Sequence, residues 1–197
     1  MSDSYSKNTL KGKDLINVGI FSAISFAIIF VVAMLGYIPI FMPLLAVIVP
    51  LVNGIPFMLF LTKVKKFGMI WIMSIIMGIL MFLTGMGYYS VLVSIVSGLI
   101  AELIYRSGKY KSATKGIFTH GIYCIWVWGN FLPMFINIDK YFSTRQDYGQ
   151  EYIDALTKLM PGWMCPVLLI ACFVSGVIGA MIGKALLKKH FVKAGIA

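Results

Sequence analysis

Six apolar segments, each close to the length that crosses a bilayer, constrain the fold more than any other feature of this sequence. A helix needs roughly 20 apolar residues to span the hydrocarbon, within a range of about 17 to 25. The sequence therefore predicts an all-α integral membrane protein, with one six-helix membrane domain over residues 1–197. The predicted spans are 15–36, 43–62, 68–84, 88–105, 116–136 and 161–187.

Composition agrees with a membrane location and argues against nucleic acid as a partner. Hydrophobic residues make up 60% of the chain and charged residues 12%, about half the charged share that is usual in soluble domains. The net charge of +10 comes from short basic runs between apolar segments, so no basic domain is available to dock DNA. Three cysteines in apolar segments indicate neither a disulfide framework nor a metal pair, and we expect no cofactor.

The basic residues also predict the orientation. Of 17 Lys and Arg residues, 14 fall in the N-terminal tail, the second-to-third and fourth-to-fifth connections and the C-terminal end. By the positive-inside rule, both termini and the tail 1–13 are cytoplasmic, and the connection 137–160 is an external loop. Within that loop, Tyr152, Ile153, Leu156 and Leu159 recur at helical spacing, which predicts a short amphipathic helix that could act as a lid.

A cluster of polar and aromatic residues in the fifth span indicates a binding pocket near the outer surface. Tyr123, Trp126 and Asn130 are three and four positions apart, so they can share one helix face. Polar groups at membrane depth are expensive unless they face a protein interior, a cavity or a ligand. The alternatives are an interfacial aromatic belt and, for Asn53 beside Pro56, bonding to freed backbone carbonyls. The candidate substrate-binding residues are Asn130, Trp126, Tyr123, Tyr88, Tyr89, Trp163, Asn53 and Tyr37.

Two strips of small residues predict close helix packing. Gly19, Ala23 and Ala27 follow one another at a spacing of four on the first span, where they suit either packing within the chain or contact with another protein. The second strip lies on the sixth span and comprises Ser175, Gly176, Gly179, Ala180 and Gly183.

Catalytic chemistry has little support in the sequence. Glu102 is the only acidic residue well inside a span, and we expect Arg106, one turn later, to be its partner. No His, Cys or acidic residues show metal-ligand spacing, and the glycines before Lys184 lack the P-loop pattern. We therefore expect no catalytic residue, no metal and no enzyme activity. A small membrane enzyme and an oligomeric membrane scaffold remain the alternatives.

The whole pattern resembles a known family. Six spans, the Gly19, Ala23 and Ala27 ladder, an external pocket and no ATPase motif look like the substrate-binding S component of energy-coupling factor (ECF) transporters. The opening KGKDLINVGIFSAI, residues 11–24, is similar to the start of the Trep_Strep group. The resemblance implies a multi-pass protein of a prokaryotic plasma membrane that captures a vitamin or related micronutrient. It also implies a transmembrane coupling (T) subunit, which would contact the ladder, and two cytoplasmic ATPases that power uptake.

Overall fold

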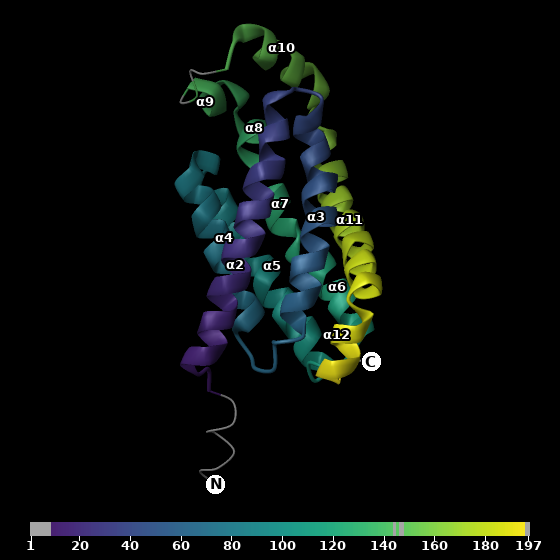
Figure 1. Cartoon of the computed structure of the whole chain (residues 1–197). Coiled ribbons are helices and arrows are strands. Elements are labelled where there is room, and N and C mark those ends of the chain that lie inside the picture. The colour runs from purple at the N-terminus through teal and green to yellow at the C-terminus, as the bar shows by residue number, and fades with distance from the viewer. Residues whose placement is uncertain (1–8, 144, 146–147, 196–197) are drawn as a thin grey trace.

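The described part of the chain consists of helices and connections without strands, and its long helices form one elongated bundle (Figure 1). The computed structural model describes residues 9–143, 145 and 148–195, so residues 1–8 of the predicted tail and part of the predicted loop lie outside it. Five helical segments are long and apolar enough to cross a membrane. They are α2 (Gly12–Ala33) with η1 (Met34–Tyr37), α3 (Phe41–Leu61), α4 (Met69–Met81) with the π-helical turn η2 (Phe82–Met86), α5 (Tyr89–Ser107) and α11 (Met164–Leu186).

Five of the predicted segments coincide with these helices, and their ends agree to within one helical turn. The predicted fifth span, 116–136, is different because it forms three short helices. They are α6 (Ala113–Tyr123), α7 (Ile125–Gly129) and α8 (Leu132–Ile136). The longest of them, α6, has 11 residues and measures about 16 Å, roughly half the hydrocarbon thickness. One continuous helix over 116–136 was therefore the wrong prediction.

The second of the two breaks, between α7 and α8, has a local cause in the backbone hydrogen bonds. Pro133 has no N–H, so the carbonyl of Gly129 loses its helical donor. The bonds around it tighten to a spacing of three residues, as in Phe131 N–H to Trp128 O at 2.9 Å, and the same spacing occurs at the first break, in Val127 N–H to Cys124 O at 3.0 Å. The segment keeps its chain direction along the bundle (Figure 1).

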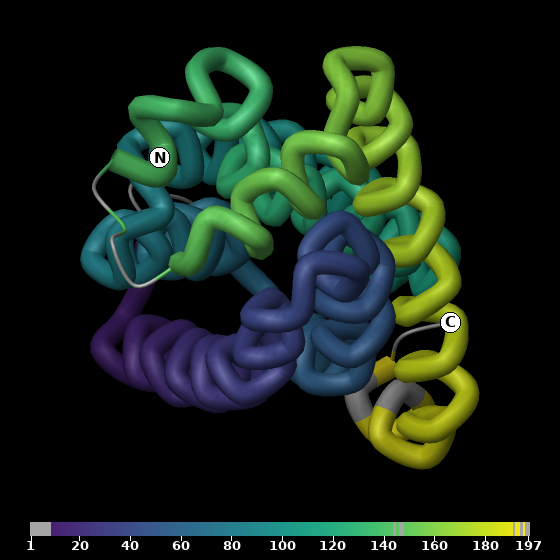
Figure 2. The backbone as a smooth tube through the Cα atoms, turned by 90° about the horizontal axis from the view of Figure 1, so that it is seen from above, coloured from purple at the N-terminus to yellow at the C-terminus, as the bar shows by residue number. Residues whose placement is uncertain are grey.

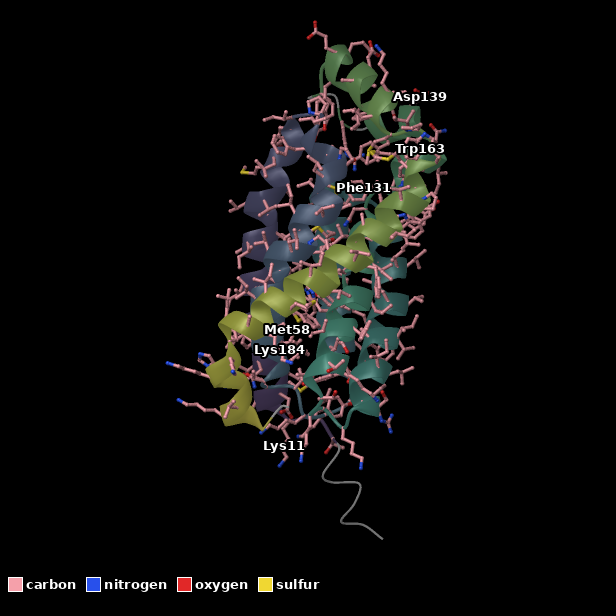
Figure 3. The ribbon with its side chains drawn as sticks, turned by 90° about the vertical axis from the view of Figure 1, so that its right-hand side faces the viewer. Lys11, Met58, Phe131, Asp139, Trp163 and Lys184 are labelled. Carbon is pink, nitrogen blue, oxygen red and sulfur yellow. The ribbon has the colours of Figure 1, made fainter. Side chains whose placement is uncertain are left out.

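The bundle has two chemically different ends. At one end α2 begins, the α3–α4 and α5–α6 connections turn, and α12 (Lys188–Ala194) lies after α11 (Figure 1). At the other end lie α9 (Ile138–Ser143) and α10 (Gln150–Leu159). Figure 3 shows Lys11 and Lys184 toward the first end, and Asp139 and Trp163 toward the second. We call the first the basic end, because it carries Lys11, Lys13, Lys63, Lys65, Lys66, Arg106, Lys109, Lys111, Lys115, Lys184, Lys188, Lys189 and Lys193.

The second small-residue strip packs inside the bundle, where Gly179 and Gly183 face α3 and Gly176 faces the end of α6. Helices α11 and α3 form the most extensive helix pair, and their backbones nearly touch where Gly179 meets Gly54. The hydroxyl of Ser175 hydrogen-bonds the Ala171 carbonyl of its own helix and also lies 3.2 Å from the carbonyl of Ala46, the group that Pro50 deprives of its helical donor. Small residues on α11 thus allow close approach, and Ser175 places a polar group beside the unpaired carbonyl of α3.

Glu102 on α5 binds the start of α4 instead of Arg106. Its buried carboxylate accepts hydrogen bonds from the backbone N–H groups of Ile70 at 2.9 Å and Trp71 at 3.2 Å, and from the Tyr110 hydroxyl at 3.0 Å. The Arg106 guanidinium lies over the Phe67 ring. The expected pairing with Arg106 is therefore wrong, since the free backbone N–H groups at the start of α4 bind the carboxylate instead.

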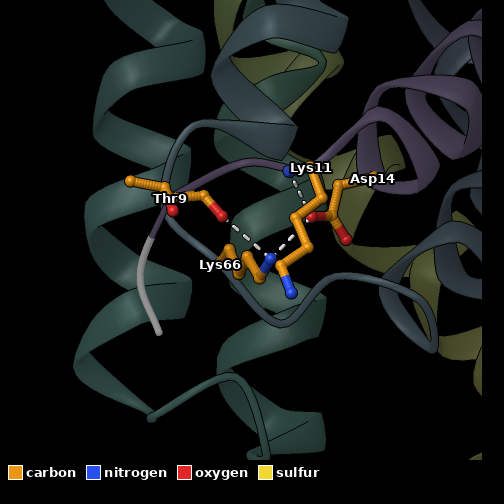
Figure 4. A network of polar contacts seen from close by, with 4 residues as sticks. All are labelled: Thr9, Lys11, Asp14 and Lys66. Atoms are coloured by element: carbon orange, nitrogen blue, oxygen red, sulfur yellow. Dashed lines mark hydrogen bonds and ion pairs between the residues drawn. The ribbon is translucent and has the colours of Figure 1, made fainter. Parts of the chain in front are cut away.

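The start of α2 is tied to the α3–α4 connection (Figure 4). The Asp14 carboxylate accepts a hydrogen bond from the Lys11 backbone N–H and forms an ion pair with the Lys66 ammonium group, both at 2.8 Å. Lys66 also donates to the Thr9 carbonyl at 2.9 Å. An acidic side chain in the first turn satisfies one of the free N–H groups at the helix start.

Candidate functional site

A cavity of about 210 Å³ lies at the end of the bundle opposite the basic end. An engineered cavity of about 150 Å³ is large enough for benzene, so this one has room for a substituted single ring. None of its lining residues is charged. The lining comes from α2 and η1 (Ile29, Phe30, Ala33, Met34, Gly36, Tyr37), α3 (Met42, Leu45, Val49), α4 and η2 (Met81, Thr84, Met86), the α7–α8 region (Trp126, Val127, Asn130, Phe131) and Tyr148.

Aromatic rings form part of its wall. Tyr37 and Tyr148 stack with their ring centroids 6.0 Å apart, and they bring the end of η1 together with the segment before α10. Trp126 lines the cavity from α7 and is 1% exposed. Rings of this kind recognise flat molecules by stacking and edge contacts. The wall is thus suited to a flat, uncharged ligand.

Asn130 gives the cavity a polar group, and the broken backbone explains its position. Its side-chain N–H group faces the carbonyls of Val127 at 3.3 Å and Trp126 at 3.5 Å. An amide has one donor end and one acceptor end, so the acceptor Oδ1 is directed away from those carbonyls. Oδ1 is buried and has no hydrogen-bond partner among the described residues. A buried acceptor without a partner costs free energy, which a hydrogen-bond donor brought against it would relieve.

Helix α10 lies across this end of the bundle, as Figure 2 shows from above. The Tyr152 hydroxyl donates to the carbonyl of Gly36, a cavity-lining residue, at 2.5 Å, and Arg145 donates to the Gly85 carbonyl. Burial raises the pKa of Tyr152 above its ordinary value, so the hydroxyl keeps its proton at physiological pH. The two contacts hold the segment around α10 against η1 and η2, beside the cavity.

The structure brings together three of the eight predicted binding residues, Tyr37, Trp126 and Asn130, in the lining of this cavity. The other five lie elsewhere. Tyr123 and Asn53 are buried outside the lining, and Tyr123 packs on Phe57 with 4.5 Å between ring centroids. Three more are away from the cavity: Tyr88 and Tyr89 stack on each other, and Trp163 is 66% exposed, as an interfacial aromatic would be.

Sequence reasoning missed most of the wall. Tyr148 comes from the polar loop and Met86 from the turn after the predicted third span, and Thr84, the last residue of that span, was not among the predicted binding residues. The stacking of Tyr148 on Tyr37 depends on the fold of a connection with no strong periodic pattern. Tyr148 could have been predicted from its aromatic side chain alone, because it lies in the predicted external loop whose helix was considered as a lid over the pocket.

The first small-residue strip lies on the outside of α2. Gly19, Ala23 and Ala27 are all exposed, and an added Cβ at Gly19 would meet nothing within 4 Å. Packing within the chain, one of the two expectations for this strip, is therefore wrong. The strip is open to lipid or to another protein.

Groups with catalytic or metal-binding potential are dispersed. Among the described residues, no three His, Cys, Asp or Glu side chains lie close enough to hold a metal ion. His120 bonds the Gly176 carbonyl through Nδ1 at 2.7 Å and contacts the Cys124 sulfur through Nε2 at 3.3 Å. It joins α6 to α11 within the core.

Five membrane-length apolar helices and an uncharged cavity between their ends define a multi-pass integral membrane protein. Comparison of sequences agrees with this class and narrows it. The chain belongs to the Trep_Strep family, described as hypothetical bacterial integral membrane proteins, whose sequence pattern matches residues 12–193. Neither a curated protein nor a solved structure matches the chain.

Proposed function

We propose that this chain is the substrate-capture subunit of an ECF-type ABC importer, which binds a vitamin or related micronutrient for uptake. The observation that carries the proposal is the uncharged aromatic cavity opposite the basic end. Asn130 is one of its lining residues, and the Oδ1 of this side chain has no hydrogen-bond partner among the described residues. A largely apolar cavity with few polar groups is the usual form of a small-molecule site.

The proposed topology has six crossings, with both termini in the cytoplasm. The α6–α8 segment would be the additional crossing, and its irregular backbone at Cys124 and Asn130 is tolerable because the bundle buries or half-buries it. Broken helices next to a cavity are a common way to build transporter sites. The basic end would face the cytoplasm, so the cavity and α10 would face outward.

The cavity limits the class of substrate. Its volume suits one substituted ring, and the lack of charged lining residues favours a molecule that is neutral where it touches the wall. Asn130 Oδ1 calls for an N–H or O–H donor on that molecule. A small heteroaromatic micronutrient with a ring donor meets all three requirements.

Partner subunits would supply the energy and the coupling. Under this proposal a transmembrane coupling subunit binds the exposed strip of Gly19, Ala23 and Ala27, and two cytoplasmic ATPases drive release. Small residues at a helix surface allow the backbone of a second helix to approach closely. The exposure of all three residues supports this assignment and equally supports an oligomeric scaffold. Binding of a micronutrient distinguishes the two, because only the substrate-capture subunit is expected to bind one.

The test is to identify small molecules that co-purify with the protein by mass spectrometry and then to measure their affinity for variants. Asn130→Ala is expected to weaken binding by roughly tenfold, since one hydrogen bond is lost. Asn53→Ala is the matched control, because Asn53 is a buried amide outside the cavity lining whose Oδ1 also has no hydrogen-bond partner among the described residues. Unchanged affinity in Asn130→Ala, or failure of any micronutrient to bind, would refute the proposal.

A further inference from the structure

A second, strongly basic cavity lies at the other end of the molecule. It has a volume of about 560 Å³ and opens between the start of α2, the end of α3 with the turn that follows, and α12. Its lining comes from segments far apart in the sequence. We call it the basic cavity, and its residues are Lys13, Asp14, Asn17, Leu59, Thr62, Lys63, Lys65, His190 and Lys193.

The positive charge of this cavity is not neutralised within the described part of the chain. Asp14 is its one acidic lining residue, and its carboxylate is bound by Lys66 and by the Lys11 backbone N–H. Lys13, Lys63, Lys65 and Lys193 make no ion pair with described residues, and all four are exposed. Several ammonium groups around one hollow repel one another, and an anion between them relieves that repulsion.

The surroundings of the cavity are those of a lipid site. Leu15 and Ile16 on α2 are 48% and 62% exposed, and they lie within one turn of Lys13 and Asn17. On α12, Val192 is 71% exposed beside Lys193. Two membrane-length helices end here, so the lysines lie at the level of lipid head groups and the exposed aliphatic residues at the level where acyl chains begin.

We propose that the basic cavity binds the phosphate group of an anionic phospholipid from the leaflet at the basic end. Basic pockets between membrane helices bind such head groups through lysine ammonium groups. The carboxamide of Asn17 offers a further polar group in the wall. Because α12 supplies Lys193 and His190, a bound lipid joins the C-terminal helix to α2 and α3. The site is independent of the proposed transport function.

The test compares lipids that differ in net charge. Full-length protein in detergent micelles is mixed with palmitoyl-oleoyl-phosphatidylglycerol or with the zwitterionic phosphatidylcholine of the same chains, and retained lipids are counted by native mass spectrometry. The double variant Lys63→Gln/Lys65→Gln is expected to bind phosphatidylglycerol roughly 30-fold more weakly, at about fivefold per lysine. A second variant, Lys13→Gln/Lys193→Gln, removes the same charge from different elements and guards against a local folding defect.

The matched control is Lys109→Gln/Lys111→Gln, which removes two charges at the basic end outside the cavity lining. The proposal holds if the wild type and this control prefer phosphatidylglycerol and both cavity variants lose the preference. It is overturned if the wild type shows no preference or if the control loses it equally. Full displacement of the lipid by inorganic phosphate, beyond the effect of sodium chloride at equal ionic strength, would also overturn it, in favour of a free phosphate site.

Discussion

A single methyl group at Gly54 tests the packing on which the bundle depends. A Cβ added at this position would lie 2.2 Å from the carbonyl carbon and oxygen of Gly179 and 2.8 Å from the Ala180 nitrogen. All three atoms belong to the backbone of α11, so no side chain can rotate away. The helices must separate by about 1 Å or more to reach ordinary van der Waals distance, across the most extensive helix pair in the molecule.

Overpacking of this kind costs about 1–3 kcal/mol, and Gly54→Ala should fall at the upper end because backbone opposes backbone. The expected fall in the thermal midpoint, measured in detergent by size-exclusion chromatography with fluorescence detection, is roughly 4–12 °C for a chain of this size. Gly19→Ala is the control: it makes the same substitution in a helix where the new methyl group meets nothing within 4 Å. That variant should match or slightly exceed the wild type, by at most about 1 kcal/mol. If the two variants melt together, close contact between α3 and α11 is refuted.

Three further predictions test contacts elsewhere in the molecule. Glu102→Ala strips the start of α4 of its acceptor and should lower stability by about 2–3 kcal/mol, whereas Glu102→Gln keeps one acceptor oxygen and should lose less; equal losses in thermal midpoint would contradict the capping role. Tyr152→Phe removes the hydroxyl that bonds Gly36, and cleavage within residues 148–160 by limited proteolysis should become roughly 2- to 10-fold faster. An unchanged cleavage rate would show that this bond does not hold the α10 segment in place. Ala23→Leu should abolish co-purification with the coupling subunit while micronutrient binding persists; Val96→Leu, exposed on α5, should leave the complex intact, and loss in both would indicate a general defect.

Much of the fold was predictable because membrane-length helices can be recognised from the hydropathy of the sequence alone. Each of the five long helices is a continuous apolar run of membrane-spanning length, so it can be located with little tertiary information. The α6–α8 segment escaped prediction because its hydropathy is continuous while its hydrogen bonding is not. Pro133 stands near its end, where a sequence pattern does not distinguish a helix that stops from one that turns.

The candidate site was less predictable, for a geometric reason. Helical spacing places Tyr123, Trp126 and Asn130 on one face, yet the break at Cys124 changes which neighbours each side chain meets. Trp126 and Asn130 line the cavity, while Tyr123 packs on Phe57 in the core. Asn130 was singled out as a polar side chain at membrane depth, and backbone-carbonyl bonding was weighed only for Asn53. In the structure the Asn130 N–H group bonds the Val127 carbonyl, and its Oδ1 is buried without a hydrogen-bond partner among the described residues.

The two small-residue strips show why composition alone does not assign an interface. On α11, Gly179 faces a glycine of α3, and the loss of helix propensity is offset by close packing within the chain. On α2, Gly19 gains no such packing within the described bundle, since no atom lies within 4 Å of a Cβ added there. The same helix lines the cavity one turn further on, through Phe30 and Ala33. Under the proposed function, a subunit that binds the exposed strip would therefore contact the helix that forms one wall of the cavity.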